Sequence, residues 1–293
     1  MSEKVIKSYK AFDKNMQCRG FQYEVGKEYE MDGEIKCCNR GFHACKSPME
    51  VWDNYDMLSS RFAEVEQSGK IDEEGNSTKV CSSHIKIKAE LKLADIIKVG
   101  VEWLKDITSP PKFKTTDGAL NDKGERNKQI GSSGYYAQIG SSGDYAKIGS
   151  SGDDAQIGSS GDYAQIGSSG YYAKIGSSGD SAQIGSSGYY AQIGSSGDYA
   201  KIGSSGDYAK IGSSGDSAKI NSTGEDSVIM CAGNNSIAKA KVGSWITLSE
   251  WEWNDEKNHY VPVCVKTEYV DGESIKADTW YQLKNGKFVE VTK

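Results

Sequence analysis

The chain has 293 residues and a net charge of −6, with 35 basic and 41 acidic side chains. This balance argues against nucleic-acid binding, which needs a concentration of Lys and Arg. No stretch approaches the roughly 18 apolar residues of a membrane span and the N-terminus has no apolar signal region, so we predict a cytoplasmic protein with no membrane partner. The seven Cys form no paired framework, which fits a reducing compartment.

Residues 1–108 predict an α+β domain. Strand character is found in four stretches, residues 5–12, 20–25, 62–66 and 80–91. The segment Ser47-Pro48-Met49-Glu50 has the pattern of a capping box, which predicts a helix that runs through Tyr55. Apolar residues at helical spacing predict a second helix over 92–108.

Five side chains of this domain belong to types that bind zinc: Cys18, Cys37, Cys38, His43 and Cys45. The C-x2-C spacing of zinc sites is absent, and adjacent Cys37 and Cys38 on a strand point in opposite directions. We interpret these residues as ordinary reduced cysteines and predict no metal and no cofactor. A nucleophile pair of His43 with Cys45, or of Cys81 with His84, is an open alternative, but a lone His is more often structural and no catalytic residue is predicted.

The stretch from Gly41 to Cys45, followed by a helix and by residues 60–65, resembles the central part of ADP-ribosyltransferase-like domains. In those domains a strand after a glycine leads to a Ser-containing helix that lines the nicotinamide pocket. The chain departs from the pattern, because Tyr9-Lys10-Ala11-Phe12 stands where a histidine is expected and no convincing catalytic Glu follows. The resemblance implies, as an alternative function, a domain that acts on NAD or a related nucleotide.

Residues 109–129 predict a linker, and residues 130–241 contain a nine-residue repeat. The consensus unit is G-S-S-G-(D/Y)-(Y/S/D)-A-(Q/K)-I, with Ile at every ninth position from Ile130 to Ile220. The alternation Tyr-Ala-Gln-Ile predicts a short strand with Ala and Ile on one side, and Gly-Ser-Ser-Gly predicts a turn in which Gly takes a positive φ. A strand of this length cannot bury its Ile alone, so we expect the units to stack.

The repeat therefore predicts a parallel β-solenoid. The favoured geometry has 18 residues per coil and about five coils, and the sequence leaves another number of units per coil open. The calcium-binding nonapeptide G-G-x-G-x-D-x-U-x is the nearest known repeat, but Ser replaces its second Gly and only Asp154 falls on its acidic position. We expect no calcium. The outward tyrosines are the predicted binding residues of the solenoid: Tyr136, Tyr145, Tyr163, Tyr172, Tyr190, Tyr199 and Tyr208. They form either a ladder that stabilises the sheets or a surface for a partner.

Residues 242–293 predict a C-terminal β-meander with turn signals at Asp271-Gly272 and Asn285-Gly286. Four tryptophans are its predicted binding residues: Trp245, Trp251, Trp253 and Trp280. The segment is either a β cap of the solenoid or a binding module through which the chain forms homo-oligomers. The whole chain is thus predicted to be mainly β, with a central solenoid between an α+β domain and a meander.

The motifs Cys18-Arg19-Gly20-Phe21-Gln22-Tyr23 and Gly41-Phe42-His43-Ala44-Cys45, the S-G-D-x-A repeats, Gly243-Ser244-Trp245 and Asp278-Thr279-Trp280-Tyr281 occur in this order. This combination resembles a group of phage and prophage proteins. The resemblance implies an accessory protein expressed inside a bacterial host, with a host or phage protein as its partner. The favoured function is a non-enzymatic binding or scaffold protein, with inhibition of a host defence system as one role; a virion structural component is another alternative.

Overall fold

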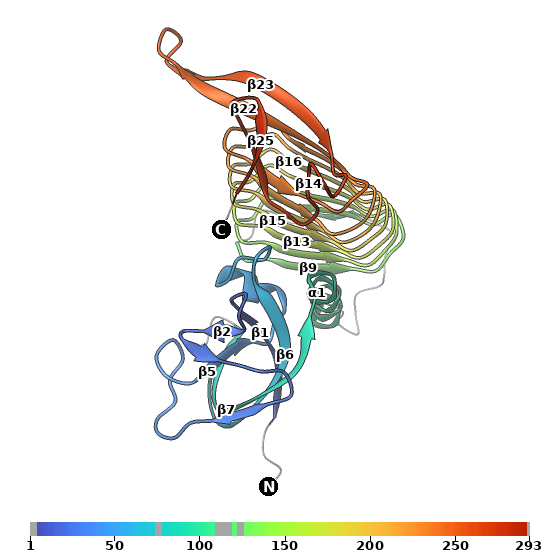
Figure 1. Ribbon diagram of the computed structural model, residues 1–293. Coiled ribbons are helices and arrows are strands. Elements are labelled where there is room, and N and C mark those ends of the chain that lie inside the picture. Colours follow the sequence, from blue (N-terminus) through green and yellow to red (C-terminus); the bar gives the residue numbers. More distant parts are fainter. Residues whose placement is uncertain (1–4, 74–77, 109–118, 122–125, 292–293) are drawn as a thin grey trace. The chain divides into compact units, whose positions relative to one another are not determined.

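The computed structural model describes residues 5–73, 78–108, 119–121 and 126–291. The chain divides into two compact units, Met1–Trp103 and Leu104–Lys293. Both are built mainly from β-strands (Figure 1). Within the described residues, no helix has the length and apolar character that crossing a membrane requires.

The first unit holds a five-stranded antiparallel sheet in the order β4-β7-β5-β1-β6, which a further β6–β7 pairing closes on itself. The strands are β1 (Ile6–Phe12), β4 (Glu28–Glu30), β5 (Phe42–Cys45), β6 (Arg61–Glu73) and β7 (Lys79–Leu91), and a small hairpin is formed by β2 (Gln17–Cys18) and β3 (Phe21–Gln22). Phe12, Phe42, Val65 and Ile85 form part of its buried core. The four predicted strand stretches all contain strands of this unit.

The predicted capped helix is a short 3-10 helix, η1 (Met49–Asp53), and its capping box does not form. Pro48 occupies the N-cap without a side-chain hydrogen bond, and a Glu50 carboxylate oxygen instead accepts hydrogen bonds from the amide and hydroxyl of Thr78, at 2.9 and 2.6 Å. The Glu50 side chain thus pairs with Thr78, 28 residues away in the chain, and not with the start of its own helix. The second predicted helix is present as α1 (Leu93–Thr108), which buries Ile96 and Ile97.

The repeat folds as a parallel β-solenoid with 18 residues per coil and about seven turns, two more than predicted. Its strands are β8 (Ala119–Asn121), β9 (Gln129–Ser132), β10 (Gln138–Ser141), β11 (Lys147–Ser150), β12 (Gln156–Ser159), β13 (Gln165–Ser168), β14 (Lys174–Ser177), β15 (Gln183–Ser186), β16 (Gln192–Ser195), β17 (Lys201–Ser204), β18 (Lys210–Ser213), β19 (Lys219–Ser222), β20 (Val228–Cys231) and β21 (Ile237–Lys239). Even-numbered strands form one sheet, here called the even sheet, and odd-numbered strands form the odd sheet. β8 lies inside the segment predicted as a linker, most of which falls outside the described residues.

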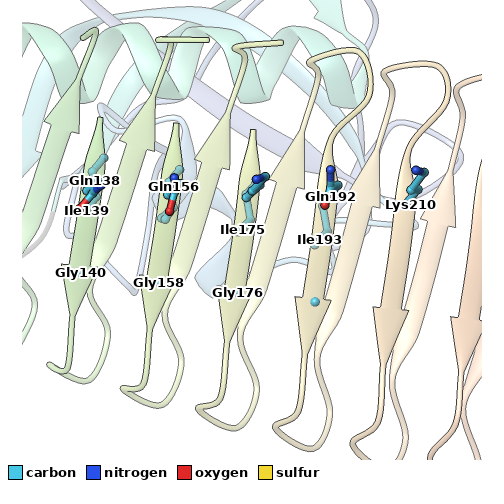
Figure 2. Close-up of a pocket in the computed structure, with 13 residues that line it drawn as sticks. Gln138, Ile139, Gly140, Gln156, Gly158, Ile175, Gly176, Gln192, Ile193 and Lys210 are labelled. Carbon is cyan, nitrogen blue, oxygen red and sulfur yellow. The ribbon is translucent and has the colours of Figure 1, made fainter. Parts of the chain in front are cut away.

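Strands pair in strict register with the strands one coil away. In the even sheet Ile139 lies opposite Ile157, and in the odd sheet Ile148 lies opposite Ile166. Figure 2 shows Gln138, Gln156 and Gln192 at the same place on their strands β10, β12 and β16 of the even sheet. Each coil is therefore a copy of the last, as the unbroken period of the sequence requires.

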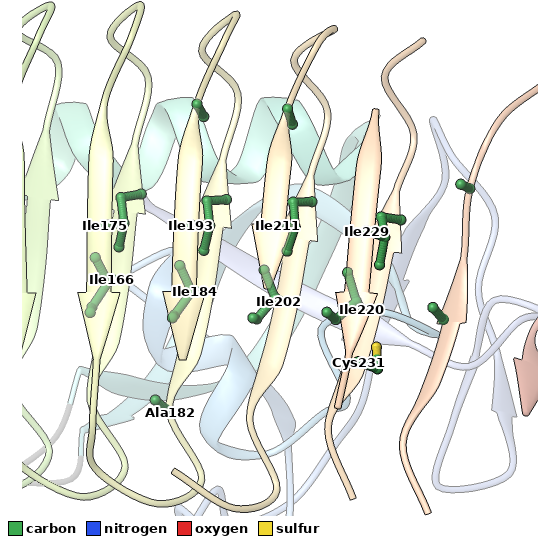
Figure 3. Packing of buried hydrophobic residues seen from close by; sticks show 14 of the residues in the cluster. Ile166, Ile175, Ala182, Ile184, Ile193, Ile202, Ile211, Ile220, Ile229 and Cys231 are labelled. Atoms are coloured by element: carbon green, nitrogen blue, oxygen red, sulfur yellow. The ribbon is translucent and has the colours of Figure 1, made fainter. Parts of the chain in front are cut away.

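The core between the two sheets is made of Ile and Ala columns (Figure 3). Ile166, Ile184 and Ile202 are fully buried. A buried Ile contributes about 1.5–3 kcal/mol relative to an exposed one, so the column is the main stabilising feature of the stack. The predicted inward positions of Ile and Ala are confirmed.

The predicted boundary between strand and turn is wrong. The strand is Gln/Lys-Ile-Gly-Ser, and the turn contains the tyrosine, which takes the left-handed conformation: φ is 56° at Tyr172, 57° at Tyr190 and 59° at Tyr208. The glycine of the turn serves close packing instead. A Cβ on Gly188 would lie 1.8 Å from the carbonyl oxygen of Gly170, one coil earlier, so no side chain fits there.

The C-terminal strands extend both solenoid sheets. β22 (Trp245–Asn254) pairs with β20 and with β23 (His259–Tyr269), and β24 (Tyr281–Lys284) pairs with β21 and with β25 (Lys287–Glu290). Val270, Ile275, Tyr281 and Leu283 join the same buried cluster as the Ile column. The segment thus covers the end of the solenoid core.

One of the two predicted hairpin turns is present. Asn285 and Gly286 connect β24 and β25 with positive φ at both residues. Asp271-Gly272 is not a hairpin turn, because the strands on either side of it, β23 and β24, do not pair. The Asp271 carboxylate instead accepts hydrogen bonds from the amides of Glu273 and Ile275, both at 2.9 Å, and so stabilises a loop.

Candidate functional site

The predicted tyrosines lie at the two turn edges of the solenoid, not on its sheet faces. Turns that lead from the odd to the even sheet carry seven exposed tyrosines, here called the tyrosine ridge: Tyr135, Tyr136, Tyr171, Tyr172, Tyr189, Tyr190 and Tyr208. Their exposed fractions range from 41% at Tyr189 to 68% at Tyr136. Tyr172, Tyr190 and Tyr208 stack in sequence, with ring centroids 5.1 and 4.9 Å apart.

The opposite turns form an aspartate ridge, defined by Asp144, Asp162, Asp180, Asp198 and Asp216. Each carboxylate accepts a hydrogen bond from an amide one coil later, for example 2.8 Å from Asp198 to Asp180 and 2.7 Å from Asp216 to Asp198; the last one, Asp216, accepts from Asn234. The remaining predicted tyrosines lie on this edge, where Tyr145 stacks on Tyr163 at 4.9 Å and Tyr199 stands alone between Ser181 and Ser217. The aspartates therefore join consecutive coils.

The outer face of the even sheet forms a shallow trough of about 680 Å³ (Figure 2). One side is a row of exposed polar side chains that begins two residues after the tyrosine ridge: Gln138, Gln156, Lys174, Gln192 and Lys210. Its floor is a row of glycines, and a Cβ at Gly158, Gly176 or Gly194 would meet no atom within 4 Å. The trough thus leaves sheet backbone open next to a row of hydrogen-bonding groups.

The four predicted tryptophans do not form one surface. Trp245 stacks against Tyr269 at 5.0 Å and Trp253 against Tyr260 at 5.3 Å, and both are about half exposed on the β22–β23 hairpin. The indole of Trp251 donates hydrogen bonds to the carbonyl oxygen of Ala232 and the hydroxyl of Ser249. Trp280 lies under the ammonium of Lys239, 5.1 Å from its ring centroid. Oligomerisation through this segment stays a prediction.

A pocket of about 460 Å³ in the first unit was not predicted from the sequence. Its walls are aromatic and its rim carries cations; the residues that line it are Tyr9, Lys10, Ala11, Cys18, Arg19, Phe21, Tyr23, Met31, Cys38, Gly41, Phe42, His43, Ala44, Cys45, Val51, Asn54, Tyr55 and Lys79. β1, the β2–β3 hairpin, β5, η1 and β7 all contribute to this lining, so the pocket is assembled from separate stretches of the sequence. No carboxylate is among the described residues that line it.

Lys10 is the central cation of this pocket and is only 4% exposed. Its ammonium donates a hydrogen bond to the carbonyl oxygen of His43 at 2.7 Å and lies 3.4 Å from the Cys18 sulfur. The ammonium also lies over the ring of Tyr23, 5.3 Å from the centroid. Burial lowers the Lys10 pKa, because the surroundings disfavour its charged form.

The cysteines and histidines considered as metal ligands lie around this pocket, but among the described residues no three His, Cys, Asp or Glu side chains are placed to hold a metal. The Nε2 atom of His43 accepts a hydrogen bond from the Cys38 amide at 2.9 Å, so it is not directed at Cys45. The Cys81 thiol donates to the carbonyl oxygen of Arg40, and His84 contacts Ser68. The hydrogen bonds of His43, Cys81 and His84 thus go to other partners than the two nucleophile pairs that the sequence left open.

Burial raises the pKa of the Cys45 and Cys81 thiols from 9.0 to about 12. In the unfolded chain both ionise near pH 9, so above that pH the unfolded state loses protons that the folded state keeps. We expect each thiol to reduce stability by about 1.4 kcal/mol per pH unit between pH 9 and 12. Urea unfolding at pH 8, 9 and 10 checks this, with Cys45→Ala/Cys81→Ala as the comparison; an equally steep loss in that variant would contradict it.

Comparison with known families gives one match. Residues 6–99 match the family described as a domain of unknown function (DUF7666). The matched range contains the closed sheet and the pocket of the first unit, and ends before the solenoid. Searches of curated proteins and of solved structures each returned no match.

Proposed function

We propose that this chain is a non-enzymatic binding protein and that the tyrosine ridge is its binding surface. The observation that carries this proposal is a row of exposed aromatic side chains, four of which (Tyr136, Tyr172, Tyr190 and Tyr208) have a backbone conformation that is unfavourable for them. Bulky residues adopt the left-handed region at a cost of about 1–2 kcal/mol each. Stacking of aromatic rings returns about 0.5–1.5 kcal/mol per pair, so the ladder of Tyr172, Tyr190 and Tyr208 adds little to the stability of the fold.

A second feature of the ridge also favours binding over stability. Tyr171 and Tyr189 stand where most other units have the aspartate whose carboxylate accepts an amide from the next coil. A phenol ring at this position does not supply that acceptor. On this edge Asp153 and Asp207 keep the carboxylate acceptor, whereas at Tyr171 and Tyr189 it is replaced by a Tyr side chain, a type that is favoured at protein interfaces.

The trough beside the ridge supplies the polar part of the proposed surface. Gln156, Lys174 and Gln192 present amide and ammonium groups in line, one coil apart. A protein partner that buries the tyrosines would find hydrogen-bond partners along this row. We propose a protein of the bacterial host as the partner, and inhibition of a host defence system as the consequence, because the ordered motifs resemble those of phage proteins.

Two alternatives receive less support. ADP-ribosyl transfer by the first unit needs a catalytic Glu, and none of the described residues that line the pocket is a carboxylate. A virion component would be found in purified particles, which mass spectrometry tests directly. A defence-inhibition panel with no effect, together with the chain in the particles, would favour this alternative over the proposal.

The ridge is tested by replacing Tyr172, Tyr190 and Tyr208 with Asn. Asn tolerates the left-handed conformation, so we expect the stability of the solenoid to change by less than about 1 kcal/mol. Binding of a host protein recovered by wild-type pull-down and cross-linking is expected to weaken at least tenfold, as for other aromatic interface residues. The affinity is measured by biolayer interferometry with the purified partner.

The matched control replaces Tyr145, Tyr163 and Tyr199, on the aspartate ridge, with Asn. This variant has the same number of substitutions in the same turn conformation, and we expect it to keep wild-type affinity. Equal loss in both variants, or no loss in the first, would show that the tyrosine ridge is not the binding surface.

A further inference from the structure

The pocket of the first unit contains a buried lysine amine that faces no carboxylate among the described residues that line it. Lys10 donates to the carbonyl oxygen of His43, lies 3.4 Å from the Cys18 sulfur, and forms no ion pair among the described residues. An ammonium buried without an anion is strongly unfavourable, and proteins place such groups opposite a carboxylate or a bound ligand. The ammonium has a third N–H, and it belongs to the lining of the pocket.

Further cations lie around the same pocket. Arg19, at the tip of the β2–β3 hairpin, is exposed and forms no ion pair among the described residues, and Lys79 lines the pocket from β7. The pKa of His43 is lowered by its burial and then by the charges of Lys10 and Arg19. The charged side chains that line the pocket are thus Lys10, Arg19 and Lys79, all of them basic, and they favour a negatively charged occupant.

The walls of the pocket have a second chemistry. Phe21 is 43% exposed, and its ring packs edge-on against Tyr23 at 4.8 Å and against Phe42 at 6.0 Å. Tyr9 and Tyr55 complete an aromatic lining. Such walls bind a flat ring by stacking and edge contacts. The volume of about 460 Å³ is within the range of sites for small organic ligands.

We infer that this pocket binds a small ligand that joins an anionic phosphate or carboxylate to a planar ring, with the anion held by Lys10 and Arg19 and the ring placed among Phe21, Tyr23 and Phe42. The site is separate from the tyrosine ridge and does not depend on the function proposed for it. Lys10 acts here as a binding residue, and no covalent step is involved.

Binding is tested on the full-length chain by isothermal titration calorimetry with AMP, benzoate, adenosine and inorganic phosphate. We expect AMP or benzoate to bind. Binding of AMP would identify the preferred anion as a phosphate, and binding of benzoate would identify it as a carboxylate. If the ring and the anion both contribute, adenosine and phosphate alone bind at least tenfold more weakly than AMP. No heat with either AMP or benzoate would overturn the inference.

Lys10→Met keeps the length of the side chain and removes its charge. We expect binding to weaken at least tenfold, whereas the control Lys14→Gln, at an exposed position outside the pocket lining, keeps wild-type affinity. Without ligand, Lys10→Met is expected to raise the melting temperature of the first unit, followed by the heat-induced reactivity of the buried Cys45 and Cys81 thiols. A lower melting temperature would show that Lys10 serves to hold the fold through His43.

A second variant keeps the inference testable if Lys10→Met does not fold. Arg19→Gln changes an exposed side chain with no ion pair among the described residues, so the fold is expected to stay intact. Binding of the same probe is expected to fall at least threefold, with a weaker dependence on salt than in the wild type. Unchanged affinity and unchanged salt dependence would contradict the assignment of the anion to this rim.

Discussion

Gly188→Ala is expected to destabilise the solenoid by about 3 kcal/mol or more, whereas Gly194→Ala changes its stability by less than about 1 kcal/mol. The two residues belong to consecutive repeat units. A Cβ on Gly188 would lie 1.8 Å from the carbonyl oxygen of Gly170 and 2.6 Å from its carbonyl carbon, and both are backbone atoms that cannot rotate away. A Cβ on Gly194 meets nothing within 4 Å, because it projects from the open face of the even sheet.

Guanidinium unfolding followed by far-UV circular dichroism measures both changes, with reactivity of the fully buried Cys231 thiol as a second probe of the same unit. Gly176→Ala, one coil before Gly194, and Gly179→Ala, half a coil before Gly188, repeat the comparison, since a Cβ on Gly176 meets no atom within 4 Å and a Cβ on Gly179 would lie 2.1 Å from the Gly161 carbonyl oxygen. If all four substitutions lower the free energy of unfolding by about the same amount, then the turn glycines are required for backbone freedom and not for the close approach of coils.

This contrast also shows what the repeat could predict and what it could not. The period of nine and the constant Ile are enough to predict stacked coils with Ile inside, because only in-register stacking buries every Ile at once. The period does not fix the number of units per coil or the place where the strand ends within a unit. Gly is the usual residue at positive φ, so the sequence predicts the turn at Gly-Ser-Ser-Gly; in the structure Tyr190 and its equivalents have that conformation, and the turn glycine lies where coils meet.

The pocket of the first unit lay beyond sequence reasoning for a different reason. Lys10, Cys18 and His43 are far apart in the chain, and only the pairing of β1 with β5 and the fold of the β2–β3 hairpin bring them together. A strand in which buried and exposed residues alternate would place Lys10 on the outward face of the sheet. β1 is buried along both faces, from Ser8 to Phe12, so alternation carries no information on this strand. The available signal was a lysine inside an otherwise buried strand.

The second large effect is expected from the Ile column. Ile184→Ala should lower the free energy of unfolding by about 2–5 kcal/mol, because Ile184 is fully buried between Ile166 and Ile202. The neighbours that would line the resulting cavity are fixed by the register of the sheet and cannot move to fill it. Ile130→Ala should cost less, since Ile130 is 9% exposed and its strand, β9, lies at the end of the odd sheet.

The position of the substitution along the stack matters because each coil contacts only its neighbours, so the stability of a solenoid is close to a sum of coil and interface terms. A defect at Ile184 weakens the interfaces on both of its sides and divides the stack into two shorter ones, whereas a defect at Ile130 leaves the remaining interfaces intact. Guanidinium unfolding of Ile184→Ala is therefore expected to be less cooperative, with a lower m-value than wild type or Ile130→Ala. An unchanged m-value with equal losses at both positions would mean that the solenoid unfolds as a single unit, in which no interface is more critical than another.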